Sequence, residues 1–325
     1  MKKALITGIT GQDGAYLTRL LLAKGYQVAG LVRDSGALNL GKLTALGVAK
    51  EAELIPTNLL DLSDILRVLG EVRPDEIYNL AAQSSVGLSF RQPIGTVEFN
   101  LLSTIQLLEA VKILGLSSRF YQASSSEMYG RVKKLPITEE TAMHPVSPYA
   151  VSKAAAHWMT VHYREAYGMF AAAGILFNHE SALRDDNFVT KKILTGAVAI
   201  SRGRRDKLRL GNLAVRRDWG YSPAYVEAMW AMLQAPEADD YVIAGGRSSS
   251  LEELVAAFFG HFGLDWQEHV VIDPKLFRPA DIDEIYGDAG KAKARLGWDF
   301  SLSLPELVSR LIDDYLALEG AKAVC

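Results

Sequence analysis

The chain has 325 residues, 49% of them hydrophobic, which is long enough for one large domain or two ordinary domains with filled cores. Its formal net charge is −3 and no block of like charges stands out, which argues against a nucleic-acid partner, because that usually requires a basic face. The single cysteine, Cys325, excludes a disulfide framework within the chain and a multi-cysteine metal site, and it favours a reducing, cytoplasmic location.

The first half of the chain alternates strand-like and helix-like segments. Apolar, β-prone runs predict strands at residues 3–7, 27–33, 54–56, 75–81, 119–123 and 170–177. Helical periodicity is found at residues 15–23, 62–69, 97–114 and 149–167. Strands that alternate with helices predict a parallel sheet covered on both faces, the doubly wound α/β arrangement.

The second half of the chain is less regular. Helices are predicted at residues 187–200, 225–233, 251–262 and 304–318, and a strand at 240–244. We expect a first domain over residues 1–173, which also receives the strand near 239–246, and a smaller, interleaved C-terminal domain over residues 174–325. A cleft between interleaved domains is the expected ligand site.

Neither a membrane nor a bound metal ion is expected. No run approaches the ~18 apolar residues of a membrane span, and the residues before the first glycine have no signal-peptide cleavage pattern. The six histidines are scattered, and no pair has the usual zinc spacing with a third ligand. A basic cluster over residues 202–209 is interpreted either as a solvated loop or as a rim that attracts a phosphate-bearing ligand.

A glycine motif follows the first predicted strand and opens the first helix, with the sequence G-I-T-G-Q-D-G at residues 8–14. Its glycines allow a tight turn, close approach of the backbone to a pyrophosphate, and packing of the helix on the strand. The helix would direct its N-terminal amides and the positive end of its dipole at the phosphates. In this context the motif predicts a Rossmann-type dinucleotide site, and its spacing resembles that of short-chain dehydrogenases/reductases.

The end of the second strand offers two opposite signals for the choice of dinucleotide. An acidic residue there binds a ribose 2′-hydroxyl, whereas an arginine accommodates a 2′-phosphate. Arg33 is followed immediately by Asp34, so the two residues favour different cofactors. The alternative interpretation of either residue is a solvated charge at the end of a strand.

Two further motifs carry acid–base chemistry. Tyr149 and Lys153 lie four residues apart on a predicted helix and therefore share a face. A lysine ammonium beside a tyrosine lowers the pKa of the phenol, which makes Tyr149 a candidate base for a hydroxyl whose carbon loses hydride. Residues 124–127, S-S-S-E, follow a predicted strand and so lie at the edge of the sheet where ligands bind. Glu127 could exchange protons there; the alternative is a polar loop with a helix cap.

Longer strings in this chain resemble the GDP-mannose 4,6-dehydratase family of extended short-chain dehydrogenases/reductases. They lie at residues 78–84, 122–130, 147–151, 163–170, 177–181, 217–220 and 277–280. The resemblance runs from residue 3 to about residue 306, and N-H-E-S at 178–181 and R-D-W-G at 217–220 are specific to this family.

The resemblance implies a 4,6-dehydration of a GDP-sugar with a bound nicotinamide cofactor. Tyr149 would deprotonate the C4 hydroxyl while the C4 hydrogen passes to the nicotinamide as hydride. Glu127 would remove the C5 proton and help protonate the departing C6 hydroxyl, and the hydride would return to C6, so that the cofactor ends unchanged. Ser125, where the family usually has Thr, would hydrogen-bond the C4 oxygen, and Lys153 would orient the nicotinamide ribose and lower the Tyr149 pKa.

The resemblance also assigns binding residues. Those implied for the cofactor are Gly8, Thr10, Gly11, Gln12, Asp13, Gly14, Arg33, Asn58, Leu59, Leu80, Ala81, Ala82, Tyr149, Lys153 and His179. Those implied for the substrate are Ser84, Glu127, Asn178, Lys192, Arg217, Arg278 and Asp281. Bidentate pairing of guanidinium with phosphate is the physical reason for arginines at a diphosphate.

Several residues depart from the family pattern. Asn58 stands where the family typically has an Asp that contacts adenine, and Asp34 stands where a second arginine is common. The resemblance puts Arg33 inside the pocket, so we expect NADP, with NAD as the alternative. The loop after the second strand, which contains Asp34, helps build tetramers in some family members. Since this chain departs from the family pattern there, we expect a homodimer, with a tetramer as the alternative. The dimer would be built on a four-helix bundle of the helices at 97–114 and 149–167.

The segment after N-H-E-S departs as well. Ala182, Asp185 and Lys191 stand where the family has Pro, Gly and Arg, and these changes fall near the expected sugar or guanine pocket.

Rival activities remain on sequence grounds. A GDP-4-keto-6-deoxymannose reductase shares the fold but would consume NAD(P)H, and a dehydratase acting on a GDP-heptose would differ only in pocket shape. A sugar-nucleotide 4-epimerase needs no C5 base, so Glu127 argues against it. A degenerate cofactor-binding sensor is disfavoured by the intact set of Ser125, Glu127, Tyr149 and Lys153.

Overall fold

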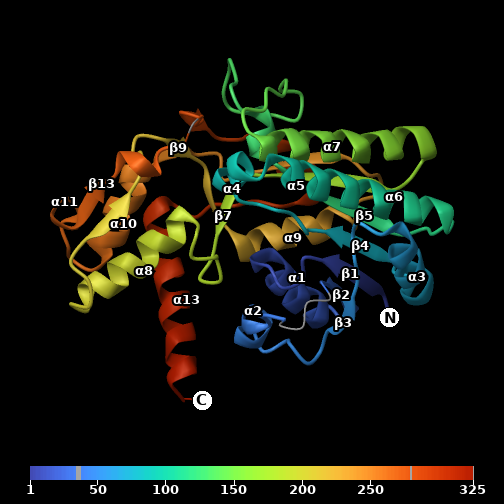
Figure 1. Cartoon of the computed structure of the whole chain (residues 1–325), viewed down its shortest axis with the longest axis horizontal. Helices are drawn as coiled ribbons and strands as arrows, with labels where there is room; N and C mark the ends of the chain where they lie inside the picture. The colour runs from blue at the N-terminus through green and yellow to red at the C-terminus, as the bar shows by residue number, and fades with distance from the viewer. Residues whose placement is uncertain (34–37, 279, 325) are drawn as a thin grey trace.

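A seven-stranded parallel sheet forms the centre of the first part of the chain (Figure 1). The computed structural model describes residues 1–33, 38–278 and 280–324, with side chains up to residue 320. The strand order is β11-β6-β5-β4-β1-β2-β3. The strands are β1 (Lys3–Thr7), β2 (Gln27–Val32), β3 (Glu53–Pro56), β4 (Glu76–Asn79), β5 (Arg119–Ser125), β6 (Ala171–Leu176) and β11 (Asp240–Ile243).

The order of the strands reverses at β1. The chain runs outward from β1 through β2 to β3 and then returns to the other side of β1 with β4. Loops at such a switch point diverge, so the carboxyl ends of β1 and β4 flank the crevice in which open α/β sheets bind ligands. The predicted strand near 239–246 joins this sheet, because β11 pairs in parallel with β6.

Helices cover both faces of the sheet. Helices α1 (Gln12–Ala23) and α9 (Ser222–Met232) lie on one side, and α3 (Leu62–Val72), α6 (Ser103–Ile113) and α7 (Pro148–Tyr167) lie on the other (Figure 1). In β1, Ala4 and Ile6 enter the core on the α1 side of the sheet and Leu5 enters the core on the α3 side, as expected when successive side chains alternate between faces. The doubly wound fold class and the long elements predicted from sequence are therefore confirmed.

The predicted helix at 97–114 has a different internal structure. It comprises α5 (Pro93–Val97), a π-helical turn η1 (Glu98–Leu102) and α6. The buried Asn100 sits in this wide turn, where its amide accepts from the Gln83 N–H at 2.8 Å and donates to Ser152 Oγ at 2.9 Å. The apolar periodicity of the segment continues through the turn, so the pattern alone does not reveal it.

The short strands of the second part were not predicted. β7 (Asn178–Glu180) pairs in parallel with β10 (Trp219–Tyr221). β9 (Arg216–Arg217) lies between β12 (Ser249–Ser250) and β14 (Glu284–Ile285), and β8 (Leu208–Leu210) pairs with β13 (Val270–Ile272). Strands of two or three residues contain no periodicity, although they carry the N-H-E-S and R-D-W-G strings.

The helices not predicted are α2 (Gly41–Ala45), α4 (Val86–Arg91), α5, α11 (Trp266–His269) and α12 (Gly290–Leu296).

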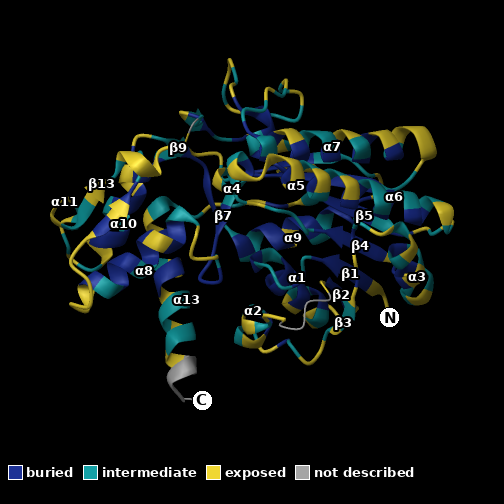
Figure 2. Cartoon of the chain, viewed as in Figure 1, coloured by how far each residue is buried: buried dark blue, intermediate teal, exposed yellow. Residues whose placement is uncertain are grey.

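A second hydrophobic core lies beside the sheet. It is formed by α8 (Val189–Ser201), α10 (Leu251–His261) and α13 (Leu304–Val324), and Figure 2 shows the buried side of these helices. Helix α10 begins with a capping box in which Ser250 and Glu253 satisfy each other's backbone amides. In the part of the chain that the structure describes, no helix is long and apolar enough to cross a membrane.

Candidate functional site

A cavity of about 1870 Å³ lies along the carboxyl edge of the sheet, between the sheet and the second core. On the sheet side it is lined by the segments that follow β1, β2, β4, β5 and β6. On the opposite side it is lined by residues from the segments 184–192, 209–219 and 275–281. Both parts of the chain therefore contribute to one continuous site.

The glycine motif forms a tightly packed loop between β1 and α1. Gly8 has φ +70°, and a Cβ atom there would lie 2.9 Å from the Ala81 nitrogen. A Cβ atom at Gly14 would lie 2.3 Å from the Gly8 carbonyl oxygen. Helix α1 starts after Gly11 without a side-chain cap, so its first amides face the cavity unmasked. This geometry fits the pyrophosphate of a dinucleotide.

The adenosine end of this dinucleotide site is open. Arg33 at the end of β2 is exposed and lines the cavity. Asn58 is exposed too, but its Oδ1 accepts from the Leu60 N–H at 3.0 Å and its own N–H donates to Asp64 at 2.7 Å. Asn58 is thus held in a local turn. Asp34, the second signal for cofactor choice, lies outside the described residues.

Helix α7 carries two of the predicted catalytic residues in buried positions. The Ser147 hydroxyl accepts from the Ala150 N–H at 3.1 Å and Pro148 occupies the first turn, so the helix begins where Tyr149 reaches the cavity. Burial raises the pKa of Tyr149 to about 12, while the Ser125 hydroxyl lowers it in part, so the pKa is raised and not lowered as expected from the sequence. Burial lowers the pKa of Lys153 to about 8, and its Nζ donates to the Ala123 carbonyl at 2.8 Å.

The carboxyl end of β5 supplies the hydroxyl and the carboxyl group. Ser125 is the last residue of β5, and its Oγ accepts from the Glu127 N–H at 3.3 Å. Burial raises the pKa of Glu127, opposed by the charges of Arg217 and Arg278. A carboxyl group with a raised pKa holds a proton more readily and is suited to taking one up and giving it back during a reaction.

Two arginines meet at the far end of the cavity. The buried Arg217 on β9 donates to Asp281 Oδ1 at 2.8 Å and to the Ile282 carbonyl at 2.6 Å. Arg278 lies 3.6 Å from the same carboxylate. Next to Arg217, Asp218 accepts from the amides of residues 245 and 246 at 2.7 and 2.9 Å, which holds β9 against the end of β11. The cluster is preorganised and cationic, as a diphosphate site requires.

Comparison with known proteins gives the family. A family model described as GDP-mannose 4,6 dehydratase matches residues 5–311. The chain is 47% identical over 333 residues to GDP-mannose 4,6 dehydratase 2 of Arabidopsis thaliana, covering 99% of this chain and 89% of that protein.

The chain belongs to the GDP-mannose 4,6-dehydratase family.

Solved structures of other proteins have the same fold. The dTDP-glucose 4,6-dehydratase DesIV of Streptomyces venezuelae, solved with NAD, has a TM-score of 0.84 and 25% identity and covers 98% of each chain. RMD of Pseudomonas aeruginosa, solved with NADPH, has a TM-score of 0.80 and 25% identity and covers 98% of this chain and 99% of that one.

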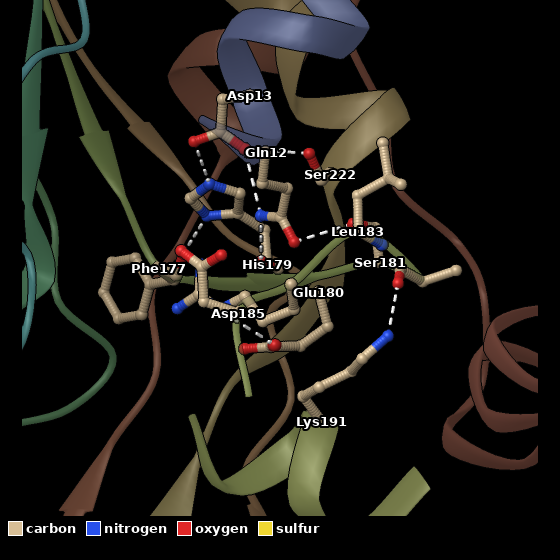
Figure 3. Close-up of polar contacts among 12 residues, drawn as sticks. Gln12, Asp13, Phe177, His179, Glu180, Ser181, Leu183, Asp185, Lys191 and Ser222 are labelled. Carbon is tan, nitrogen blue, oxygen red and sulfur yellow. Dashed lines mark hydrogen bonds and ion pairs between the residues drawn. The ribbon is translucent and has the colours of Figure 1, made fainter. Parts of the chain in front are cut away.

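The structure brings the site residues expected for the family together. Every residue predicted for catalysis, cofactor or substrate lines the cavity. Several of them also direct polar atoms at protein groups. Gln12, Asp13 and His179 hydrogen-bond one another across the base of the glycine loop, as Figure 3 shows.

Arg184 was not predicted. It lines the cavity, its Nε lies 3.3 Å from Glu180 Oε2, and its guanidinium lies 3.8 Å from the centre of the Phe188 ring. Its charge helps to lower the pKa of Tyr149. The segment after N-H-E-S contains this arginine in the sequence, but it has no spacing rule that singles it out.

We expect Gly14→Ala to weaken binding of a nicotinamide dinucleotide by at least about tenfold, equivalent to about 1.4 kcal/mol. The added Cβ would meet only backbone atoms, at 2.3 Å from the Gly8 oxygen and 2.6 Å from Ile9 Cα, so the loop would have to move. Titration of cofactor-stripped protein measures this. Gly70→Ala on α3 is the matched control, because nothing lies within 4 Å of its new methyl group. Wild-type affinity in Gly14→Ala would contradict the expected role of the loop.

Proposed function

We propose that this chain is a GDP-mannose 4,6-dehydratase that converts GDP-mannose to GDP-4-keto-6-deoxymannose and water. The observation that carries the proposal is the partly buried Glu127, which shares one cavity with Tyr149 and Lys153. A carboxyl group beside a hydride-transfer pair adds the C5 base that simple oxidation or epimerisation at C4 does not need. Family membership supports the same reaction.

Each side chain takes its role from its place around the cavity. The nicotinamide cofactor would accept the C4 hydrogen as hydride and return it at C6. Tyr149 would take the proton of the C4 hydroxyl, and Ser125 would hold the C4 oxygen at the end of β5. Glu127 would take the C5 proton and give a proton to the C6 hydroxyl, which leaves as water. The hydride and one proton then return to C6 and C5, so the net change is the loss of one water.

The substrate diphosphate would bind at the arginine cluster. Arg278 and Lys192 face the cavity beside Arg217, and Asp281 holds the guanidinium of Arg217 in place. Ser84 and Asn178 line the same cavity on the sheet side and could hydrogen-bond the sugar.

The experiment that tests the proposal is incubation with GDP-mannose without added reductant, followed by the mass of the product. We expect a product lighter by one water and no consumption of NADPH. A protein that leaves GDP-mannose unchanged but reduces GDP-4-keto-6-deoxymannose with one NADPH per turnover would be the reductase. A product of unchanged mass that differs from GDP-mannose at C4 would favour the epimerase. If a GDP-heptose reacts much faster than GDP-mannose, the preferred substrate is a GDP-heptose.

We expect Glu127→Gln to retain binding of cofactor and GDP-mannose but to lose dehydration by about 10²–10⁴-fold. The amide keeps the shape of the side chain and cannot accept the C5 proton. Single-turnover rates and binding titrations measure the two effects separately. Glu227→Gln on the exposed face of α9 is the control. A near-normal rate in Glu127→Gln would remove this residue from the mechanism.

We further propose NADP as the cofactor, because the exposed guanidinium of Arg33 at the end of β2 can pair with a 2′-phosphate. A charge-assisted hydrogen bond contributes roughly 1.5–3 kcal/mol, so Arg33→Ala should cost at least about tenfold in NADP affinity and little in NAD affinity. The measurements are the identity of the cofactor released on denaturation and both dissociation constants. Release of NAD, or an unchanged NADP/NAD ratio in Arg33→Ala, would contradict the proposal.

We also propose a homodimer built through the outer face of α7 and the α5–α6 helix. Trp158 on α7 is 58% exposed, and Val151, one helical heptad before it, is exposed on the same face. Ile94 and Ile113 are exposed on the neighbouring helix. Large apolar side chains gathered on one face are typical of a subunit interface.

We expect Trp158→Arg to convert this dimer to a monomer, because an arginine at the centre of an apolar interface must be desolvated without a partner. Light scattering at micromolar concentration measures the mass. Ile272→Arg on β13, equally exposed at the other end of the molecule, should leave it unchanged. A wild-type monomer would overturn the proposed dimer, and a wild-type tetramer would add a second interface.

A further inference from the structure

A partly buried ion pair lies at the base of the glycine loop (Figure 3). Asp13, in the first turn of α1, accepts from His179 Nε2 on β7 at 2.8 Å. The other oxygen of Asp13 accepts from the Ser222 hydroxyl at 2.8 Å and from Gln12 Nε2 at 3.1 Å. The other ring nitrogen of His179 lies 2.7 Å from the Phe177 carbonyl oxygen.

This geometry requires a charged imidazole. A carboxylate and a carbonyl can only accept, so both nitrogens of the His179 ring must carry hydrogen. Burial lowers the pKa of His179, but the charge and hydrogen bond of Asp13 raise it more, and the net pKa lies above its usual value. Burial also opposes the charge of Asp13, yet the His179 charge leads the contributions that hold the pKa of this carboxyl well below its usual range. The ring stacks on Tyr225 with centroids 4.8 Å apart, a favourable contact for a cation.

The position of Asp13 makes this charge necessary. An acidic side chain in the first turn of a helix competes for the same amides and dipole that bind an anion. A bare carboxylate there would repel a pyrophosphate arriving at the loop. The imidazolium of His179 cancels that charge through its hydrogen bond from Nε2 to the Asp13 carboxylate.

We propose that His179 is a positioning residue whose imidazolium neutralises Asp13, so that the glycine loop accepts the pyrophosphate of the dinucleotide. The proposal rests on the proposed use of a nicotinamide dinucleotide but not on the sugar reaction. It assigns His179 an action through Asp13, and it makes cofactor affinity depend on the protonation of one buried histidine.

A second, uncharged clamp allows the charge to be tested apart from the attachment of the loop. Gln12 Nε2 donates to the His179 carbonyl at 3.1 Å, and Gln12 Oε1 accepts from the Ser181 hydroxyl at 2.7 Å. The clamp uses the backbone of residue 179. Loop and β7 therefore stay joined when the imidazole is replaced.

Other titratable groups face the pair from the surrounding elements. Arg184, in the segment after β7, lowers the pKa of both His179 and Asp13. Asp13 raises the pKa of Lys153 on α7, although burial keeps that pKa low, at about 8. Tyr225 on α9 stacks on the ring, and Glu180 is paired with Arg184.

Three variants separate charge from structure. His179→Gln keeps a donor for Asp13 but removes the positive charge, so NADP and NAD should bind roughly tenfold more weakly at pH 7. Asp13→Asn combined with His179→Gln removes both charges and should recover affinity to within about threefold of wild type. Ser222→Ala removes a neutral donor to the same carboxylate and is the matched control. Thermal midpoints of the stripped proteins check that each variant folds.

The pH dependence gives a second readout. Because the pKa of His179 is raised, cofactor affinity should be full below that pKa and fall as the pH rises through it. The double variant retains Lys153, whose pKa burial lowers to about 8, so it supplies the baseline and should lack the His179 step. Nitrogen-15 chemical shifts of the ring should report both nitrogens protonated at pH 7 in the stripped protein.

Each outcome bears on the proposal directly. Recovery in the double variant with a protonated ring at pH 7 supports it. A double variant as weak as His179→Gln, or a neutral ring at pH 7, would overturn it. Cofactor binding is measured without substrate, so failure to dehydrate GDP-mannose would leave the result intact.

Discussion

The contact between the glycine loop and the segment after β4 is the constraint on which the rest of the site depends. Gly8 approaches Ala81 so closely that no side chain fits between them. Thr7 secures this approach, because its Oγ1 accepts from the Leu80 and Ala81 amides at 3.0 Å and donates to Asn79 Oδ1 at 2.7 Å. Asn79 in turn donates to Gln122 at 2.8 Å. A line of buried polar side chains thus crosses β1, β4 and β5 and aligns their carboxyl ends.

The electrostatics of the cavity follow from burial. Burial raises the pKa values of Tyr149 and Glu127 and lowers that of Lys153, so it shifts all three groups toward their neutral forms. A neutral Tyr149 is a proton donor, so this residue has to lose its phenolic proton before it can act as the base for the C4 hydroxyl. The fixed positive charge lies at Arg217 and Arg278, where a diphosphate would need it, and it also acts on Glu127, whose pKa it lowers against the effect of burial. The sheet edge and the second core therefore divide the chemistry between proton transfer and anion binding.

The sequence predicted those parts of the structure that produce long patterns. The strands β1 to β6 and helix α7 are apolar or periodic runs, and the motifs at their ends meet because parallel strands end at one edge. The wide turn around Asn100 was not predicted, because its polar residue is stabilised by partners on other elements. Two-residue strands such as β9 depend on pairing with distant segments, and no local pattern indicates them. The ion pair between His179 and Asp13 was not predicted either, because the two residues lie more than 160 positions apart in the sequence.

The π-helical turn has a consequence for the outer side of its helix. In an uninterrupted α-helix, Ile94 and Leu102 would point about 80° apart, because eight residues do not complete a whole number of turns. The wide turn takes up about one extra residue, which brings the two side chains to within about 20°. Leu102 and Ile113, separated by eleven residues of nearly regular helix, are also about 20° apart. The insertion that directs Asn100 inward therefore sets the rotational phase of the exposed residues Ile94, Leu102 and Ile113, which form one straight apolar line.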